Sequence, residues 1–152
     1  MESNTNNTNN NSDINNINNI VSNNSLNKIE LLNSKLLEFL SYLKNVIRNM
    51  INKSNNNIKN KYYNFIINNI KSSQSQIKMS LMYNNESILD LFEQNILQYK
   101  SDILKKNDYI IEEIQDKIFG NKINLYSVWE NINIEDKTII WKYLNVFILL
   151  SE

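Results

Sequence analysis

The longest regular pattern of apolar positions in this chain runs from residue 29 to residue 50. Its apolar residues recur at alternating spacings of three and four, which places them on one side of an α-helix, and two further residues widen the stripe. Such a stripe can pair with a second copy of the chain or pack inside one bundle, and its width favours the bundle. Asn27, with Glu30 three residues later, is the predicted N-cap. The stripe consists of Ile29, Leu32, Leu36, Phe39, Leu40, Leu43, Val46, Ile47 and Met50.

A second, shorter helical pattern follows the polar run 55–57, which we expect to break the first helix. The stretch "KSSQSQ", residues 71–76, has no apolar period and is typical of a loop. The apolar face of this second helix is predicted to consist of Ile58, Tyr62, Phe65 or Ile66, and Ile70.

From residue 86 an apolar face recurs over about 30 residues and predicts one long helix. Gly120, the only glycine, is its predicted end, because glycine adopts the left-handed conformation of a helix C-cap without a Cβ penalty. The face consists of Leu89, Phe92, Ile96, Tyr99, Ile103, Ile110, Ile114 and Ile118.

The chain closes with a helix that is apolar almost all the way round. A short turn, residues 123–130, leads to it, and Asn133 is its expected N-cap. Between residues 139 and 150 only Lys142 and Asn145 are polar. Because this stretch is roughly 18 Å long and a bilayer core is roughly 30 Å thick, it does not predict a membrane span. It predicts either the central helix of a bundle or a helix that needs a groove on a partner.

Residues 1–25 are rich in asparagine and contain no lysine, arginine or aromatic residue. Their few apolar side chains cannot offset the entropy of ordering the backbone, so we expect a disordered arm. Asparagine and isoleucine both have A/T-rich codons, so an A/T-biased genome accounts for their abundance. The predicted fold is all-α: a bundle of four or five helices, residues 26–152, behind a disordered Asn-rich N-terminal arm.

The composition excludes several kinds of chemistry. The chain has no cysteine and no histidine, which removes thiolate nucleophiles, disulfides, Ser-His pairs and the usual zinc sites. The single arginine, Arg48, removes multi-arginine phosphate clamps. We therefore expect no enzyme, no catalytic residue and no cofactor. The first residues lack the basic start and apolar core of a signal peptide, so we expect an intracellular protein.

The stretch "LYSVWENINIEDKTIIWKYLNVFILLSE", residues 125–152, resembles a segment near the end of uncharacterised proteins of giant nucleocytoplasmic DNA viruses. The resemblance covers under a fifth of the chain and brings no known activity. It implies a viral origin, with the host cytoplasm or the virion as location, and a recurring packing or docking element. The matching residues are Trp129, Glu135, Asp136, Lys137, Ile140, Trp141, Lys142, Tyr143 and Leu144.

Three aromatic residues in this segment, Trp129, Trp141 and Tyr143, are the candidate anchors for a protein partner. Tryptophan is enriched at the energetic centres of protein interfaces. The alternative is ordinary core packing, which is the commoner role of an aromatic residue inside an apolar helix, and we favour it for the two tryptophans.

Charge is spread unevenly, although the formal net charge is zero. Residues 26–80 contain nine basic and two acidic residues, whereas residues 81–152 contain seven lysines and twelve acidic residues. The basic half could follow a phosphate backbone. We favour the alternative that the basic half packs against the acidic half, since a neutral total removes the usual electrostatic footprint of nucleic-acid binding. The nucleic-acid candidates are Lys44, Arg48, Lys59, Lys61 and Tyr62.

Four acidic residues, Asp108, Glu112, Glu113 and Asp116, resemble a carboxylate metal site only in composition. Lysines are interspersed among them and no histidine is available, so we expect a solvated face and no metal. The leading prediction is a non-enzymatic protein–protein interaction or scaffolding module that binds a protein partner, or itself, through apolar helix faces. The alternative is a nucleic-acid-binding accessory protein.

Overall fold

The computed structural model describes residues 9–82, 94–119 and 123–152. Side chains are described for residues 27–79, 94–117 and 123–152. Within these residues the fold is all-α, as predicted, and contains no strand. The elements are α1 (Asn9–Lys53), α2 (Asn57–Met82), the 3-10 turn η1 (Leu97–Tyr99), α4 (Lys100–Leu104), the 3-10 turn η2 (Asp108–Ile110), α5 (Ile111–Ile114), the π-helical turn η3 (Gln115–Phe119), α6 (Leu125–Trp129) and α7 (Ile134–Ser151).

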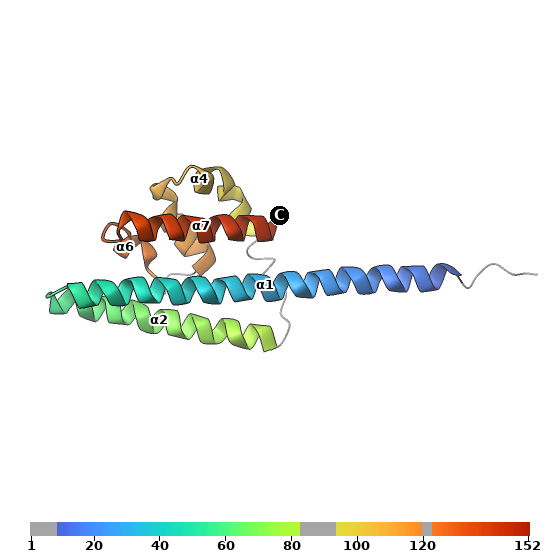
Figure 1. Ribbon diagram of the computed structural model, residues 1–152, viewed down its shortest axis with the longest axis horizontal. Helices are drawn as coiled ribbons and strands as arrows, with labels where there is room; N and C mark the ends of the chain where they lie inside the picture. The colour runs from blue at the N-terminus through green and yellow to red at the C-terminus, as the bar shows by residue number, and fades with distance from the viewer. Residues whose placement is uncertain (1–8, 83–93, 120–122) are drawn as a thin grey trace, which may run out of the picture.

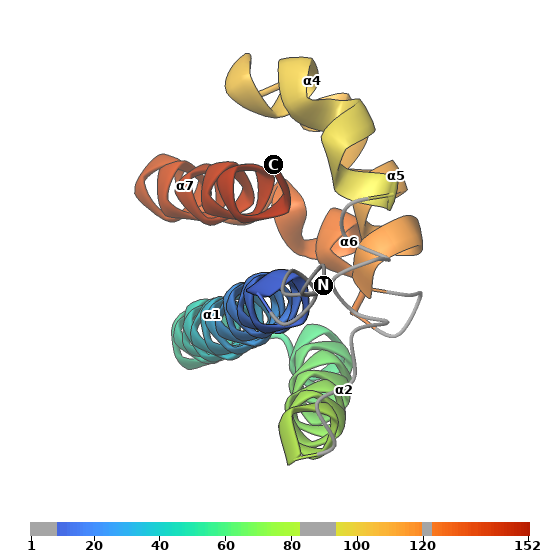
Figure 2. The ribbon, with the colours of Figure 1, turned by 90° about the vertical axis from the view of Figure 1, so that its right-hand side faces the viewer.

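The long helices lie in layers. In Figure 1, α2, α1, α7 and α4 follow one another from bottom to top, and Figure 2 shows α1 between α2 and α7. The apolar stripe predicted between Ile29 and Met50 lies on α1, and we call it the α1 seam. It accounts for this order, because it is wide enough to face two neighbouring helices at once. Eight of its nine residues are buried and Met50 is half-buried. The predicted intramolecular packing of the seam is confirmed.

The closing helix α7 is central in the described fold, because α1 packs on one side of it and α4 on the other. This accounts for its apolar circumference, with Ile140, Leu144 and Phe147 fully buried. The predicted cap is confirmed: the Asn133 side chain accepts a hydrogen bond of 2.7 Å from the backbone N–H of Asp136. None of the described helices has an apolar stretch long enough to cross a membrane.

The predicted loop at residues 71–76 is wrong, since α2 continues through it to Met82. The helical spacing of buried positions continues through this stretch, but the buried position is occupied by a polar residue. Gln74 takes the buried position that follows Ile70, and its Nε2 donates to Ser41 Oγ of α1 over 2.8 Å. Its Oε1 accepts a hydrogen bond of 3.1 Å from Lys44 Nζ. A hydrogen-bonded glutamine therefore continues the α1–α2 interface where sequence periodicity shows no apolar residue.

The predicted long helix from residue 86 is also wrong in its described part, because the backbone turns at residues 105–107. Lys106 adopts a positive φ of 56°. Its N–H donates to the carbonyl of Ile103, and the N–H of Asn107 donates to that of Asp102, at 3.1 and 3.0 Å. This pair of bonds is a Schellman ending of α4. A lysine thus has the left-handed role that the sequence suggested for Gly120, which lies outside the described residues.

Although the helix is broken, its apolar face is confirmed where side chains are described. The predicted residues Ile96, Tyr99, Ile103, Ile110 and Ile114 are all buried. The remaining members of that face lie outside the residues with described side chains: Leu89, Phe92 and Ile118.

The predicted turn at residues 123–130 contains a short helix, α6, whose residues Val128 and Trp129 enter the core. Asn124 caps it by accepting a hydrogen bond of 3.2 Å from the N–H of Ser127. A five-residue helix leaves too few positions to show a period, so the sequence did not distinguish it from a turn.

The N-terminal part of α1 extends past the ends of α2 and α7, and no described element lies beside it (Figure 1). Most of the predicted arm therefore lies outside the packed domain, as its scarcity of apolar residues leads us to expect. The backbone of α1 passes through residue 27 without a break, so Asn27 is not an N-cap. Residues 1–8 lie outside the described part of the chain.

Candidate interaction surface

Trp129 and Trp141 form an aromatic pair in the core. Their ring centroids are 5.6 Å apart, the planes meet at 83°, and each residue is 3% exposed. Lys137 Nζ lies over the Trp129 ring, 5.2 Å from its centre, which is the position of a cation–π contact. A partner cannot reach either indole unless the core opens. The packing alternative therefore accounts for both residues, and the folded domain does not present them as anchors.

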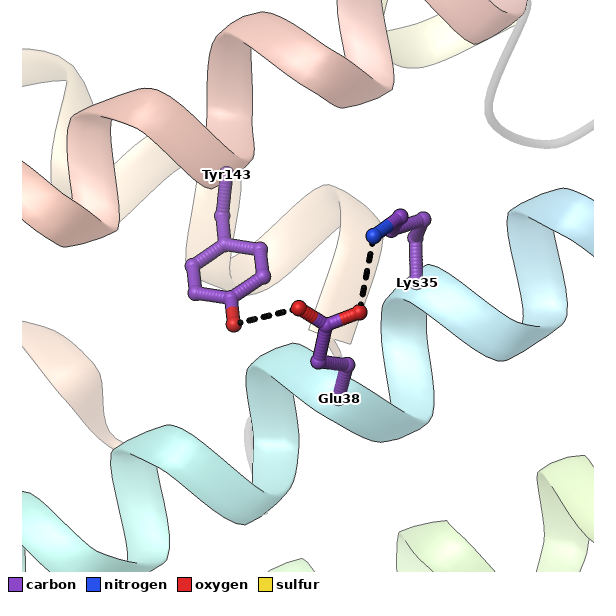
Figure 3. A network of polar contacts seen from close by, with 3 residues as sticks. All are labelled: Lys35, Glu38 and Tyr143. Atoms are coloured by element: carbon purple, nitrogen blue, oxygen red, sulfur yellow. Dashed lines mark hydrogen bonds and ion pairs between the residues drawn. The ribbon is translucent and has the colours of Figure 1, made fainter.

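Tyr143, the third predicted anchor, joins α7 to α1. Its hydroxyl donates to Glu38 Oε1 over 3.1 Å, and Lys35 Nζ lies 2.8 Å from Glu38 Oε2 (Figure 3). The hydrogen bonds from Lys35 and then Tyr143 lower the pKa of the Glu38 carboxyl, while burial raises the pKa of the Tyr143 phenol. The Tyr143 ring also packs at 5.3 Å from that of Phe39. Tyr143 thus packs against α1 within the described fold and contributes to the contact between α7 and α1.

A second tyrosine fastens the same two helices. The Tyr42 hydroxyl of α1 donates to the Asp136 carboxylate in the first turn of α7. Burial, followed by this hydrogen bond, raises the pKa of the Tyr42 phenol. Two phenol–carboxylate bonds therefore hold α7 against α1 beside their shared apolar core.

The exposed face of α2 carries a row of large side chains at helical spacings of four and three. Ile58 is 82% exposed, Phe65 is 61% exposed, and Tyr62 between them is 38% exposed. We call these three residues the α2 stripe. The sequence predicts that Ile58 and Tyr62 face the core, and that prediction is wrong. Of the predicted alternatives Phe65 and Ile66, Ile66 is the buried residue.

The reason is that α2 has two apolar faces. The one that packs on α1 includes the predicted Ile66 and Ile70, together with Tyr63 and Ile67, all of which are buried. Both faces have helical spacing, so periodicity alone did not identify the buried one.

Tyr62 is fixed in place by α6. Its hydroxyl lies 2.6 Å from Ser127 Oγ and accepts a hydrogen bond of 2.9 Å from Asn124 Nδ2. Tyr126, the neighbour of Ser127, is also exposed. The α2 stripe therefore lies on one continuous helix, and its residue Tyr62 is also hydrogen-bonded to α6 and its N-cap.

A shallow, open hollow of about 650 Å³ lies over the α1–α2 turn at one end of the stripe. Asn56 caps α2 there by accepting hydrogen bonds from the N–H groups of Ile58 and Lys59. The hollow contains amides, a hydroxyl and one amine, but no paired acid and base. Its lining consists of Ser54, Asn55, Asn56, Asn57, Ile58 and Lys59.

The structure divides the residues predicted for nucleic-acid binding. Tyr62 belongs to the stripe. Lys59 and Lys61 lie near the N-terminal end of α2, roughly 18 Å and 15 Å along the helix from Lys71. Lys44 and Arg48 lie on α1, where Lys44 is hydrogen-bonded to Gln74 in the C-terminal half of α2 and Arg48 lies one helical turn nearer the α1–α2 turn.

Two further lysines join Lys44 and Arg48: Lys71 and Lys78 of α2. Burial and then the charges of Arg48, Lys71 and Lys78 lower the pKa of the Lys44 ammonium, so each of these three cations lies within electrostatic range of Lys44. We call these four residues the α1–α2 basic cluster. Sequence reasoning missed its α2 members because they border the stretch that was predicted to be a loop.

The acidic residues Asp108, Glu112, Glu113 and Asp116 are all exposed, which agrees with a solvated face. Among the residues with described side chains, no three acidic groups come together in a way that could hold a metal ion.

Comparison of the chain with protein-family models, with curated proteins and with solved structures finds no match.

Proposed function

We propose that this chain is a protein–protein interaction module without enzymatic activity, and that its partner docks on the α2 stripe. The exposure of Ile58 and Phe65 on a rigid helix is the observation that carries the proposal. No described residue of the chain covers these side chains. Exposed apolar patches mark interaction sites, and amphipathic helices are recognised through anchors spaced by three and four residues.

The partner presents apolar side chains bordered by aspartate or glutamate. Helix α2 contains four lysines and no acidic residue. Two of them, Lys59 and Lys61, flank the stripe, are exposed, and form no ion pair with a described residue. An acidic border on the partner complements these charges, fixes the register of docking and speeds encounter.

We also propose a giant-virus origin, which rests on the resemblance of residues 125–152 alone. In the fold this segment forms α6 and α7, most of whose large apolar residues pack in the core, with Ile134 and Leu149 exposed. We therefore expect core packing, and not docking, to be what this segment shares with the viral proteins that it resembles.

The test captures the full-length tagged chain from its native or infected host cell after nuclease treatment. A zero-length carbodiimide then couples lysine amines to carboxylates in contact with them. We expect cross-links from Lys59 or Lys61 to acidic residues of one partner. The double variant I58S/F65S should lose this partner while its melting midpoint stays unchanged, since exposed positions change stability by about 0.5 kcal/mol or less.

Leu149→Ser is the matched control, because Leu149 is 68% exposed on α7 and the change likewise removes an exposed apolar side chain. This variant should keep the partner. Equal capture by I58S/F65S and L149S would remove the α2 stripe as the docking site. A chain that cross-links to no protein would contradict the interaction function itself.

A further inference from the structure

The C-terminal half of α2 forms, with α1, a second surface whose chemistry differs from that of the stripe. Lys71 and Lys78 are seven residues apart on α2, about 10 Å along the helix axis. Lys44 and Arg48 are four residues apart on the neighbouring helix. Lys44 Nζ donates to Gln74 Oε1 across the two helices, and Gln74 Nε2 in turn donates to Ser41 Oγ of α1. The four cations thus lie on two packed elements.

No described carboxylate neutralises this cluster. The ion pairs of the described residues, Lys35–Glu38 and Lys100–Glu152, do not involve it, and α2 has no acidic residue. The acidic residues of α1 with described side chains are Glu30 and Glu38, and Glu38 is directed to Tyr143 and Lys35 on the side facing α7. The cations therefore repel one another in the folded chain, and a bound anion would relieve that repulsion.

The side chains between the two lysines of α2 are mostly of the polar kinds that bind phosphate groups. Between Lys71 and Lys78 the sequence is Ser-Ser-Gln-Ser-Gln-Ile, in which the isoleucine is half-buried and three of the polar residues are exposed. Serine hydroxyls, glutamine amides and the cations of lysine and arginine are among the donors that bind phosphate oxygens in protein–DNA complexes. A protein partner would instead require apolar anchors at the centre of its interface. Stacking on unpaired bases is also absent from this chemistry, since no aromatic residue lies in this stretch.

We propose that the α1–α2 basic cluster binds the phosphate backbone of nucleic acid without sequence preference. This site is separate from the α2 stripe and does not depend on the proposed protein partner. It keeps Lys44 and Arg48 of the predicted nucleic-acid site and replaces Lys59, Lys61 and Tyr62 by Lys71 and Lys78.

The test is fluorescence anisotropy of two unrelated, labelled 20-base-pair duplexes with the full-length chain, titrated at several salt concentrations. Both duplexes should bind with the same affinity. The plot of log affinity against log salt should fall with a slope of about −3 to −4 if the four cations each neutralise one phosphate. K71Q and K78Q should each make that slope less steep by about 1.

Lys59→Gln and Lys61→Gln are the matched controls, because they remove the same charge from exposed positions of the same helix outside the cluster. They should leave the slope unchanged. Absence of duplex binding at 50 mM salt would overturn the proposal, and so would equal losses in K59Q and K71Q. Competition by polyglutamate as strong as by unlabelled duplex would show an acidic-protein site and not a phosphate site.

Discussion

Lys106 shows how one residue can end a helix against its own preference. The left-handed conformation costs a residue with a Cβ roughly 1–2 kcal/mol. Here it is stabilised by the two backbone hydrogen bonds that close α4 and by Asp102, whose carboxylate accepts from Asn107 Nδ2 at 2.7 Å and from the Tyr109 hydroxyl at 2.6 Å. These local hydrogen bonds, all within residues 102–109, therefore fix a turn for which the sequence offers no glycine.

Lys106→Gly should raise the free energy of unfolding by about 1 kcal/mol, because glycine adopts this conformation without the Cβ penalty. Urea titration measures the change. Lys105→Gly is the control: Lys105 is right-handed, with φ of −83°, so glycine there should lower stability by about 0.5–1 kcal/mol. A less stable K106G variant would contradict the Schellman ending of α4.

Trp129 of α6 and Trp141 of α7 pack against each other in the core. Trp141→Ala should lower the free energy of unfolding by about 3–5 kcal/mol, because truncation of a buried aromatic side chain leaves a cavity. Leu149→Ala, on the exposed side of the same helix, should change it by about 0.5 kcal/mol or less. Similar urea midpoints for W141A and L149A would show that the indole is not core.

At the scale of the element, α2 combines three surfaces along one helix. One face packs on α1, the N-terminal part exposes the stripe, and the C-terminal part contributes to the basic cluster. Gln74 allows this, because its two hydrogen bonds carry the α1 interface through a stretch with no apolar residue at the core position. Had residues 71–76 formed a loop, Lys71 and Lys78 would have had no fixed spacing.

Ser72→Pro tests whether this stretch is helical. Proline in a helix interior removes a hydrogen bond and clashes with the preceding turn, so S72P should cost about 3 kcal/mol or more in unfolding free energy. The control is Asn57→Pro at the first position of α2, which tolerates proline because its N–H needs no intrahelical partner. If thermal melts of S72P and N57P coincide, residues 71–76 do not form a stable helix.

At the scale of the whole molecule, α1 and α7 are the two central helices of the described fold. Helix α1 packs on α2 and α7, and α7 packs on α1 and α4. The basic helices α1 and α2 pack mainly on each other. The predicted basic half meets the predicted acidic half where α1 packs on α7 and where Tyr62 of α2 is hydrogen-bonded to Ser127 of α6. That leaves the outer side of the α1–α2 pair without described carboxylates.

Removal of residues 1–25 should leave the melting midpoint of the domain unchanged. No described element lies beside that part of α1, and asparagine is a poor helix former without tertiary packing. Removal of residues 1–36 is the comparison, since it deletes three buried residues of the α1 seam, Ile29, Leu32 and Leu36, and should lower the midpoint sharply. Circular dichroism melts of the two truncations measure both effects, and a large loss on removal of residues 1–25 would place the arm inside the domain.

The sequence by itself determined what depends on spacing within one segment. The α1 seam, the apolar face of residues 96–114, the Asn133 cap and the all-α class all follow from side chains three or four residues apart, or from an N-cap three residues before the amide it binds. The absence of cysteine and histidine likewise excluded whole chemistries without reference to any fold.

Only the tertiary structure decided matters that depend on which segments meet. Either face of α2 could have been buried, and the position of α1 selected the one with Ile66 and Ile70. Gln74 is acceptable in the interface because Ser41 and Lys44 lie opposite it, and the cations of the basic cluster are neighbours only because α1 and α2 pack together. Periodicity shows which faces of a helix could be buried. Which face is buried, which side chains are hydrogen-bonded and which charges are neighbours depend on how separate helices pack together.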